Sequence, residues 1–415
     1  MNCVFLSPVG VIGGAERVLI HLLDAVDKLF PGAQRTLIQL GDGPLADEAA
    51  RRGVSVVVEP ATQSLASVGD TQWRDARSPS HAAVAAGVAL SKSIPGVWRL
   101  ADRLRARFRS IEPSFIHSNG MKAHVLARLA APRGTPRLLH LHDFFSHRPL
   151  ARVVLPFLAA GRAHGIAVSH AVARDVRALV PSLPTSVVHN PVDTDHFAPG
   201  LVDGASLDRT AGLPPAEGVV RVGMVGTYAN WKGHATFLEA LALVPEVRGF
   251  IVGGPIYATY GSQWTLEGLK AVATQLGVAE RVGFVPFQGD PVEAYRSLDI
   301  VVHASTRPEP FGLTIAEAMS VGKAVIAAAD GGALELFTED VDALGHRPGD
   351  AVDLARQIRA LATDSNRRCR LGDQARVSAL SRFSTARFMA AVESALRKIG
   401  MTNRHRHRRL PVSSR

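Results

Sequence analysis

Short apolar runs alternate with helix-compatible stretches along almost the whole chain, and this alternation constrains the fold more than any other feature of the sequence. A first series of runs lies at Cys3–Leu6, Leu37–Leu40, Val54–Val58, Phe115–His117, Leu138–His142, Ile166–Val168 and Val187–His189. A second series lies at Val219–Val225, Gly249–Val252, Val282–Val285, Ile300–His303 and Ala324–Ala327. Strands that alternate with amphipathic helices predict parallel sheets covered by helices on both faces. The expected fold class is therefore α/β.

The two series are separated by a loop-like segment over 200–218 that is rich in Asp, Gly and Pro. Because a chain of 415 residues is too long for one ordinary core, we expect two doubly wound, Rossmann-like domains. Ligands of such sheets bind beyond the carboxyl ends of the strands, so the cleft between the domains is the expected site. The predicted boundaries are an N-terminal domain over 1–195, a linker over 196–218, a second domain over 219–383, a C-terminal helix over 384–399 and a basic disordered tail over 400–415.

Positive charge is concentrated in the first half of the chain and at its C-terminal end. Residues 1–195 carry 22 Lys and Arg against 15 Asp and Glu, whereas residues 196–399 carry 20 against 22. Residues 400–415 add five Arg and no acidic residue, and the net charge of the chain is +10. This asymmetry indicates an anionic acceptor or membrane surface facing the first half. Nucleic acid is not an expected partner, because aromatic residues make up only 6% and no nucleic-acid motif is present.

Residues 97–111 have the pattern of a basic amphipathic helix. Apolar residues recur every three or four positions from Val97 to Ile111, and arginines fill much of the remainder. Two interpretations are compatible: a surface helix packed on a sheet with solvated arginines, or a helix that also contacts anionic lipid head groups. Residues 60–95 show little periodicity, which is compatible with a mobile loop or with a loosely packed insertion, and we assign no structure to them.

The cysteines and the apolar runs indicate the compartment. Cys3 and Cys369 belong to no metal or redox spacing, so we expect two free, buried thiols in a reducing environment. The N-terminus enters an apolar run without a basic leader, which is typical of a first strand and not of a signal peptide. No stretch approaches the ~20 apolar residues that a spanning helix needs. We therefore expect a cytoplasmic protein, with peripheral contact to the inner face of the cell membrane as a further expectation.

The strongest functional signal is a segment that directly follows the run Ile300–His303. Its sequence is Arg307-Pro308-Glu309-Pro310-Phe311-Gly312-Leu313-Thr314-Ile315-Ala316-Glu317-Ala318-Met319. The two prolines keep the chain around Glu309 extended. Gly312 lets a ligand approach the backbone, and a helix that begins near Leu313 offers free N–H groups and a positive dipole end. The segment therefore suits a diphosphate, with Glu309 before the helix and Glu317 within it.

The two glutamates are not spaced like the carboxylate pair of a glycosidase. Eight helical residues would separate Glu309 and Glu317 by about 12 Å along the axis. Hydrolysis by paired carboxylates needs a separation of roughly 5–9.5 Å. We interpret them as two hydrogen-bond acceptors for hydroxyl groups on one long ligand.

This motif resembles the glutamate–seven–glutamate motif of glycosyltransferase family 4, a retaining family with the GT-B fold of two facing Rossmann-like domains and an interdomain cleft. The resemblance implies that Glu309 lies near the donor sugar and that Glu317 accepts hydrogen bonds from the nucleotide ribose. It also implies that backbone amides of Phe311, Gly312, Leu313 and Thr314 hold the sugar and the diphosphate. Other segments match in order, so the resemblance covers nearly the whole chain to about residue 399.

Two glycine-containing turns extend the resemblance. Gly13 and Gly14 follow the first strand and open a helix, where backbone amides meet a phosphate or sugar. In the second domain Lys232 reaches the diphosphate as a point charge. The family usually has an arginine where this chain has Thr227, which leaves Lys232 as the only cation in its loop. The segment ending at Val285 is expected to meet the nucleotide base through its backbone. The Gly-Gly turn before Glu335 is interpreted as a loop closing a helix start, without ligand contact.

A histidine is expected opposite the donor. His142 ends a strand and is followed by Asp143, as in many relatives, and a neutral imidazole there hydrogen-bonds a sugar hydroxyl. The alternative is a strand-end histidine bonded to backbone. His117 is a second, weaker candidate.

These inferences predict a nucleotide-sugar-dependent glycosyltransferase acting on a glycan, lipid-linked or small-molecule acceptor. Glu309 and His142 are the expected catalytic residues. No cofactor or metal is expected beyond the nucleotide-sugar substrate. Two alternatives remain open: another sugar-nucleotide enzyme on this fold, such as an epimerase or a phosphorylase, and a non-enzymatic basic protein that binds membranes.

Overall fold

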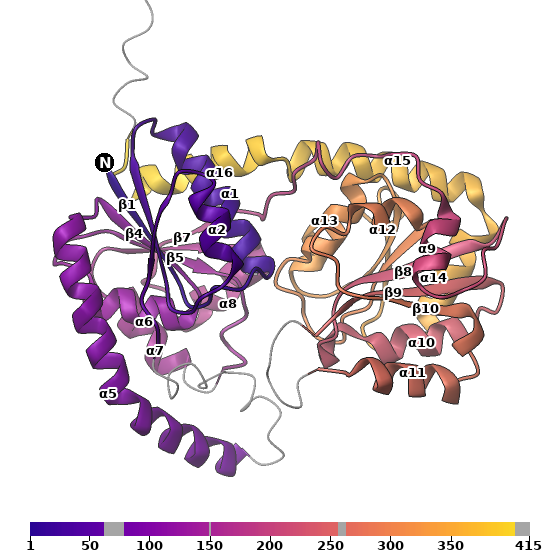
Figure 1. The fold of residues 1–415 in the computed structure, drawn as a ribbon, viewed down its shortest axis with the longest axis horizontal. Coiled ribbons are helices and arrows are strands. Elements are labelled where there is room, and N and C mark those ends of the chain that lie inside the picture. Colours follow the sequence, from indigo (N-terminus) through magenta and orange to yellow (C-terminus); the bar gives the residue numbers. More distant parts are fainter. Residues whose placement is uncertain (62–78, 149–150, 256–262, 403–415) are drawn as a thin grey trace, which may run out of the picture.

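The computed structural model describes residues 1–61, 79–148, 151–255 and 263–402, with the backbone alone described over 79–93. Two lobes, each built on one sheet, lie side by side in Figure 1. No helix among the described residues is long and apolar enough to cross a membrane.

The first lobe contains a seven-stranded sheet in the order β3-β2-β1-β4-β5-β6-β7, with every pair parallel. Its strands are β1 (Asn2–Ser7), β2 (Gln34–Gln39), β3 (Ser55–Val58), β4 (Phe115–Asn119), β5 (Arg137–Leu141), β6 (Ala163–Ala167) and β7 (Thr185–Val187). Its helices are α1 (Gly14–Leu29), α2 (Pro44–Ala50), α5 (Pro79–Ile111), α6 (Met121–Ala130), α7 (Ala151–Ala159) and α8 (His170–Leu179).

The second lobe contains a six-stranded parallel sheet in the order β10-β9-β8-β11-β12-β13. Its strands are β8 (Val220–Thr227), β9 (Val247–Gly254), β10 (Val282–Val285), β11 (Ile300–His303), β12 (Ala324–Ala328) and β13 (Leu344–His346). The helices that follow the first lobe are α9 (Gly204–Thr210), α10 (His234–Ala242), α11 (Leu266–Gln275), α12 (Val292–Ser297), α13 (Leu313–Ser320), α14 (Ala351–Thr363), α15 (Ser365–Arg382) and α16 (Thr385–Lys398). Short 3₁₀ turns η1 (Asn230–Lys232), η2 (Ala279–Arg281) and η3 (Gly332–Glu335) interrupt the loops.

The predicted α/β class, with two doubly wound Rossmann-like sheets, is confirmed by this topology. In each sheet the first strand lies between the second and the fourth, so the strand order reverses beside β1 and beside β8. Ligands of such sheets bind at that reversal, beyond the carboxyl ends of the strands. The loops after β1, β8 and β11 therefore become the candidate binding loops.

The C-terminal helices connect the two lobes, as the yellow helices of Figure 1 show. Helix α15 packs on α13 and β12 of the second lobe, whereas α16 packs on α1 of the first. The buried side chains Phe388, Val392 and Leu396 of α16 belong to the same core cluster as α1. The chain thus crosses between the lobes twice, and the crossings meet where the Val192 amide donates to the Phe383 carbonyl at 2.8 Å.

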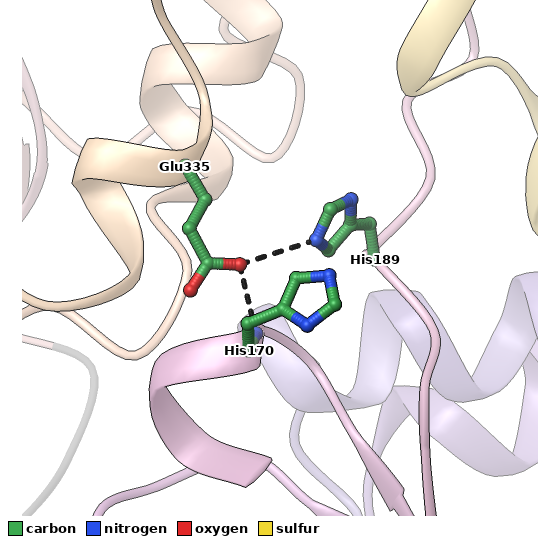
Figure 2. Close-up of side chains that lie close together, drawn as sticks. All are labelled: His170, His189 and Glu335. Atoms are coloured by element: carbon green, nitrogen blue, oxygen red, sulfur yellow. Dashed lines mark hydrogen bonds and ion pairs between the residues drawn. The ribbon is translucent and has the colours of Figure 1, made fainter. Parts of the chain in front are cut away.

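A carboxylate of the second lobe also binds the first lobe. The Glu335 side chain, from η3, accepts hydrogen bonds from the backbone amides of His170 (2.7 Å) and Ala171 (2.6 Å) at the start of α8. His189 Nε2 lies 3.4 Å from the same carboxylate, and Figure 2 shows the three residues converging from both lobes. Glu335 therefore caps a helix across the lobe boundary, in keeping with the expectation of a structural role.

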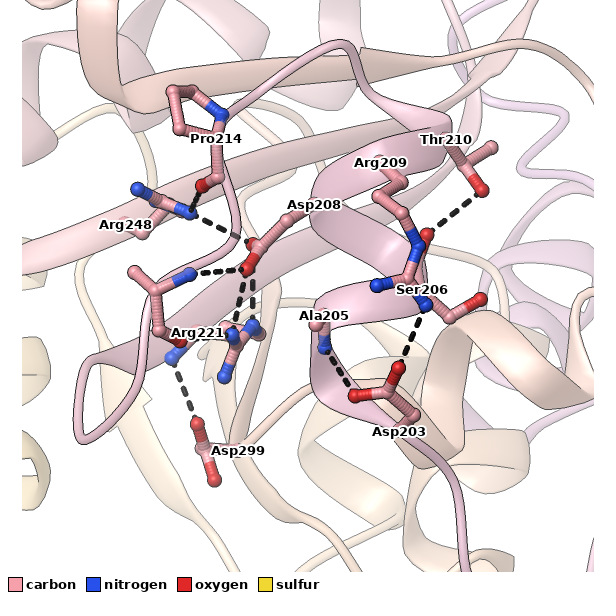
Figure 3. Close-up of polar contacts among 11 residues, drawn as sticks. Asp203, Ala205, Ser206, Asp208, Arg209, Thr210, Pro214, Arg221, Arg248 and Asp299 are labelled. Atoms are coloured by element: carbon pink, nitrogen blue, oxygen red, sulfur yellow. Dashed lines mark hydrogen bonds and ion pairs between the residues drawn. The ribbon is translucent and has the colours of Figure 1, made fainter.

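The segment 200–218, which we expected to be loop-like, contains helix α9. The Asp203 side chain caps it by accepting from Ala205 N at 2.9 Å. On its buried side Asp208 is fully enclosed and pairs with Arg221 (2.7 Å) and Arg248 (3.0 Å), as Figure 3 shows. The prediction was wrong because this helix of seven residues has too few apolar positions to produce a period.

Other expectations need correction. No structure was assigned to residues 60–95, yet α5 already begins at Pro79; residues 62–78 lie outside the described residues. Strand β13 does not correspond to any apolar run identified in the sequence, so it was not predicted. Both cysteines are free, but Cys369 is exposed and not buried as expected.

The amphipathic pattern over 97–111 forms the end of α5. Leu100, Leu104 and Phe108 are buried against the first sheet. Two of the arginines are not simply solvated, because Arg103 and Arg107 each lie 3.0 Å from the buried carboxylate of Glu59. The packed surface helix is therefore the interpretation that these contacts support.

Candidate active site

A cavity of about 390 Å³ lies between the lobes, at the carboxyl ends of the strands. The first lobe contributes the loop after β1 and the end of β5, and the second contributes the loops after β8 and β11. Ten of the predicted site residues line it: Gly14, His142, Thr227, Lys232, Glu309, Phe311, Gly312, Leu313, Thr314 and Glu317. The predicted location of the site, between two facing lobes, matches this cavity.

Glu309 is buried at the centre of a polar cluster. Its Oε2 atom accepts from Lys232 Nζ at 2.7 Å, from His303 Nε2 at 3.0 Å and from Ser305 Oγ at 3.0 Å. The backbone is held as well, because Gly332 N donates to the Glu309 carbonyl at 2.6 Å. Glu309 is therefore fixed by residues from three segments, with its carboxylate held from the loop after β8 and from the end of β11, and its backbone held from the loop after β12.

Opposing effects act on the pKa of Glu309. Burial alone would raise it, but the Lys232 ammonium and the hydrogen bond from His303 outweigh burial and hold this pKa well below its usual range. Glu309 is accordingly ionised at neutral pH. A carboxylate stabilised in this way is a weak base and a weak nucleophile, so its role is electrostatic and orienting.

Helix α13 begins at Leu313, directly after Gly312, as the sequence predicted. Gly312 adopts a φ of +99°, and a Cβ there would lie 2.8 Å from Ile315 Cδ1. Glycine is therefore the residue that lets the chain turn into the helix. The first-turn amides of Leu313 and Thr314 have no partner within the helix, and both residues line the cavity. This helix start is a suitable anion site.

Glu317 lies one turn further into α13, and a hydrogen bond from another helix fixes its side chain. The Tyr295 hydroxyl donates to its Oε2 at 2.8 Å, and both side chains are buried. Burial raises the pKa of Glu317, an effect that Arg17 and the Tyr295 hydroxyl partly offset. The two glutamates thus have opposite pKa shifts, because only Glu309 has a cation in direct contact.

The loop after β8 carries Lys232 at the end of η1. It is followed by Gly233, whose φ is +80° and where a Cβ would lie only 1.9 Å from the Ala304 carbonyl oxygen. This close approach brings the Lys232 loop against the loop after β11, which explains the contact with Glu309. Thr227 brings no charge to the cavity. Among the described lining residues, Arg17 and Lys232 are the ones with a permanent positive charge.

The glycine loop after β1 already uses one of its backbone amides for a hydrogen bond to helix α1. Gly13 caps α1, and its amide donates to Glu16 Oε2 at 3.1 Å. Burial raises the pKa of Glu16. Gly14 and Ala15 line the cavity, whereas Gly13 is not among the described lining residues. Contact of this loop with a donor therefore stays a prediction that rests on Gly14.

His142 lines the cavity from the first lobe and is oriented by Asn119. Because the Asn119 amide nitrogen faces the Ala15 carbonyl, its oxygen accepts from His142 Nε2 at 2.7 Å. Burial lowers the pKa of His142 to about 4, so the ring is neutral at pH 7. His117, the weaker candidate, is fully buried and contacts His140 Nδ1 at 3.1 Å. It is a core residue and does not reach the cavity.

Val285 is fully buried in β10 and does not line the cavity in the described part of the chain. The residues that do so from this segment are Phe287 and Gln288, beyond the strand end. Sequence reasoning also missed His303, Ser305, Arg17 and Tyr295. Polar residues at the end of a buried strand were an available signal for His303 and Ser305, and Arg17 closely follows the glycine pair Gly13–Gly14, but no pattern pointed to Tyr295.

Two family models match the chain, one for each lobe. The model described as Glycosyltransferase Family 4 matches residues 12–196, and the model described as Glycosyl transferases group 1 matches residues 211–378. A D-inositol 3-phosphate glycosyltransferase of Mycobacterium sp. (strain KMS) is 38% identical over 169 residues, which are 40% of this chain and 37% of that protein. The one from Mycolicibacterium smegmatis is 36% identical over 41% of this chain and 39% of its own length. The chain therefore matches little more than a third of the length of these relatives.

Solved structures match over both lobes. Anabaena Alr3699/HepE in complex with UDP and glucose superposes with a TM-score of 0.76 at 26% identity, over 96% of this chain and 99% of that one. Sucrose-phosphate synthase from Thermosynechococcus elongatus has a TM-score of 0.77 at 18% identity, over 96% and 99% of the two chains. The second likeness concerns the fold alone.

Proposed function

This chain belongs to glycosyltransferase family 4 and has the GT-B fold, and from that premise we propose that it transfers a sugar from a UDP-sugar to a glycan, lipid-linked or small-molecule acceptor. One observation carries the proposal: the Glu309–Lys232 pair and the start of α13 face His142 and Gly14 of the other lobe across one cavity. The choice of UDP is supported by the Anabaena protein, which is 25% identical to this chain in its complex with UDP-glucose.

In this proposal the second lobe holds the donor. The diphosphate lies at the first-turn amides of Leu313 and Thr314, within reach of Lys232. The ribose hydroxyls donate to Glu317, which Tyr295 holds in position. The base lies beyond the end of β10, near Phe287 and Gln288. The sugar extends toward Glu309 and His142, so its hydroxyl groups meet one fixed carboxylate and one neutral imidazole.

The chemical step breaks the bond between the anomeric carbon and the β-phosphate oxygen. Lys232 and the amides at the start of α13 stabilise the charge that develops on the leaving diphosphate. The acceptor oxygen bonds to the anomeric carbon on the same face, and its proton passes to the departing phosphate, which retains the configuration. Glu309 orients the sugar in this scheme, since its low pKa makes it a poor nucleophile. Closure of the lobes excludes water from the reaction.

A cytoplasmic location with peripheral membrane contact is also part of the proposal. The free thiols Cys3 and Cys369 suit a reducing compartment. The excess of positive charge in residues 1–195 supports contact with an anionic surface or acceptor.

The donor assignment predicts that UDP raises the melting temperature of the chain more than GDP or ADP does. Ligands that bind only the folded state stabilise it, by about 2.7 kcal/mol at a hundred times the dissociation constant. Thermal unfolding with each nucleotide at matched concentrations measures the effect. Equal shifts with all three nucleotides would contradict the choice of UDP, and no shift with any of them would contradict a nucleotide-sugar donor.

Glu317 gives a second, smaller prediction. The Tyr295→Phe variant should bind UDP about tenfold more weakly, because a hydrogen bond to a charged group contributes roughly 1.5 kcal/mol. The turnover number should change little, since Tyr295 acts through the ribose contact and not at the anomeric carbon. Calorimetric titration with UDP and steady-state kinetics separate the two quantities.

Tyr228→Phe is the matched control, because Tyr228 is buried in the same lobe but does not touch Glu317. Unchanged UDP affinity in Tyr295→Phe would remove Glu317 from the ribose site.

A further inference from the structure

A second cavity, of about 540 Å³, lies at the edge of the first sheet and shares no described lining residue with the donor cavity. It is bounded by the edge strand β7, by α8 and by α16. We call it the hinge pocket. Its lining residues are His170, Arg177, Thr185, Ser186, Val187, His189, Arg382, Arg387, Phe388, Ala391, Ser394 and Lys398.

The hinge pocket is strongly basic. Arg177, Arg382, Arg387 and Lys398 line it, and none of the described lining residues is acidic. The contacts of three of these cations are with neutral oxygens: Arg382 donates to the Leu336 carbonyl, Arg387 to a backbone carbonyl, and Lys398 to a serine hydroxyl, each at 2.9 Å. Such contacts orient the cations without neutralising their charge. Four positive side chains around one concave site attract an anion.

The hinge pocket touches both crossings between the lobes. The first crossing leaves β7 through His189, which lines the pocket. The second crossing runs from Arg382 to Arg387, and both of these residues line it as well. His189 also packs toward the donor cavity, since its ring lies 5.7 Å from that of Phe311. A ligand in this pocket would therefore contact both connections at once, next to a donor-site residue.

A metal ion is the alternative occupant, because ligand atoms of His170, His189 and Glu335 all lie within 4.8 Å of one another (Figure 2). Two observations argue against it. The Glu335 carboxylate already accepts two backbone hydrogen bonds that cap α8. Both histidines also line the basic pocket, where the positive charges of the arginines and Lys398 repel a metal cation.

We propose that the hinge pocket binds a small phosphate-bearing ligand. Arginine guanidinium groups pair with phosphate oxygens through two parallel hydrogen bonds, and a lysine adds a point charge. Arg177 on α8 and Arg387 on α16 both line the pocket, so a phosphate group or a short run of phosphates bound there contacts both helices. The ligand thereby ties α8 of the first lobe to the crossing that leads into α16. This site goes beyond the transfer reaction and does not depend on it.

The test is calorimetric titration of the full chain with inorganic pyrophosphate. The double variant Arg177→Gln/Arg387→Gln should bind pyrophosphate about tenfold more weakly or worse, since two charged hydrogen-bonding groups are lost. The matched control is Arg174→Gln/Arg397→Gln, which removes the same charge from exposed positions on the same two helices, outside the pocket. The control should bind within about twofold of the unmodified chain. Pyrophosphate bound in the donor cavity contributes equally to both variants, so their difference reports on the hinge pocket.

Equal affinity in the two double variants, with melting temperatures unchanged, would overturn the proposal. Tight Zn²⁺ binding that His189→Ala abolishes, without any pyrophosphate difference, would replace it with the metal site. Flotation with vesicles of phosphatidylglycerol and phosphatidylcholine distinguishes the source of the phosphate. If only the pocket variant loses vesicle binding while pyrophosphate binding is unaffected, the proposed soluble ligand is wrong.

Discussion

Replacing Lys232 with alanine should lower the turnover number about 10²- to 10³-fold, the usual effect of removing one preorganised donor at a developing negative charge. Lys232 Nζ lies 2.7 Å from Glu309 and borders the cavity where the start of α13 offers its amides. Because Thr227 brings no charge, Lys232 has no neighbouring cation in its own loop to share the task. Steady-state kinetics with UDP-sugar measure the loss.

The folded state must be checked in the same variant. Removing one partner of a buried ion pair is destabilising, but Glu309 keeps its hydrogen bonds from His303 and Ser305. Lys232→Met replaces the ammonium group, whose nitrogen lies 4.1 Å from the centre of the Trp231 ring, by an uncharged side chain of similar length, and serves as a second variant that is expected to stay folded. The control is Lys270→Ala on the exposed side of α11. Full activity in a folded Lys232→Met protein would refute the role of the cation.

The contact between Lys232 and Glu309 also predicts that substitutions at these two positions have non-additive effects on activity. Glu309→Gln keeps the shape of the side chain but removes the charge that holds Lys232, so its activity should fall by a similar factor. In the double variant Lys232→Met/Glu309→Gln the loss should be clearly smaller than the product of the two single losses, because residues in direct contact share their interaction energy. A strictly multiplicative double variant would mean that the two residues act independently.

The positions of the binding loops could be predicted from the sequence because each depends on local chain chemistry. The alternation of apolar runs marks the strands, and the glycine and proline pattern around Glu309 marks the turn into α13. Gly312, which we expected to let a ligand approach the backbone, lies directly before this helix and has a positive φ. Lys232 and Glu309 were expected in one site because both follow a strand end and both lie in segments that resemble motifs of family 4.

What the sequence did not indicate depends on packing between distant segments. Tyr295 meets Glu317 only because α12 and α13 lie against the same sheet, and Arg17 reaches the cavity only because the lobes face each other. The ion pair between Lys232 and Glu309 is a further example. It requires the close approach of two loops at Gly233, which depends on the absence of a Cβ and on no local sequence pattern.

Asp208 could not be recognised either, although it carries the largest stability effect that we expect. It lies in a segment that reads as a loop, yet it is fully enclosed and pairs with Arg221 and Arg248 (Figure 3). The Ala216 amide also donates to it at 3.1 Å. Asp208→Asn should lower the free energy of unfolding by about 3–5 kcal/mol, because it leaves two largely buried guanidinium groups without their counter-charge. The shift of the urea denaturation midpoint measures this cost.

Asp203→Asn is the matched control on the same helix. Asp203 is exposed and pairs with Arg209 at the surface. Asparagine caps a helix as well as aspartate does, so this variant should lose no more than about 1 kcal/mol. A similar midpoint shift in both variants would contradict the special position of Asp208.

The pH dependence of the stability difference between the unmodified chain and Asp208→Asn tests whether the charge of Asp208 causes it. Burial alone would raise the pKa of Asp208, but the hydrogen bonds from Arg221 and Arg248 outweigh it, so the pKa in the folded state lies below the ordinary value of 3.8. A carboxylate with a lowered pKa stabilises the fold fully above the pKa of the unfolded chain, and this stabilisation is lost as the pH falls through the folded value. The stability gap between the unmodified chain and Asp208→Asn should therefore be constant from about pH 8 to pH 5 and narrow below about pH 4. Other carboxylates titrate in both proteins and cancel in the difference. A gap that persists unchanged at pH 3 would mean that the loss comes from altered packing and not from the missing charge.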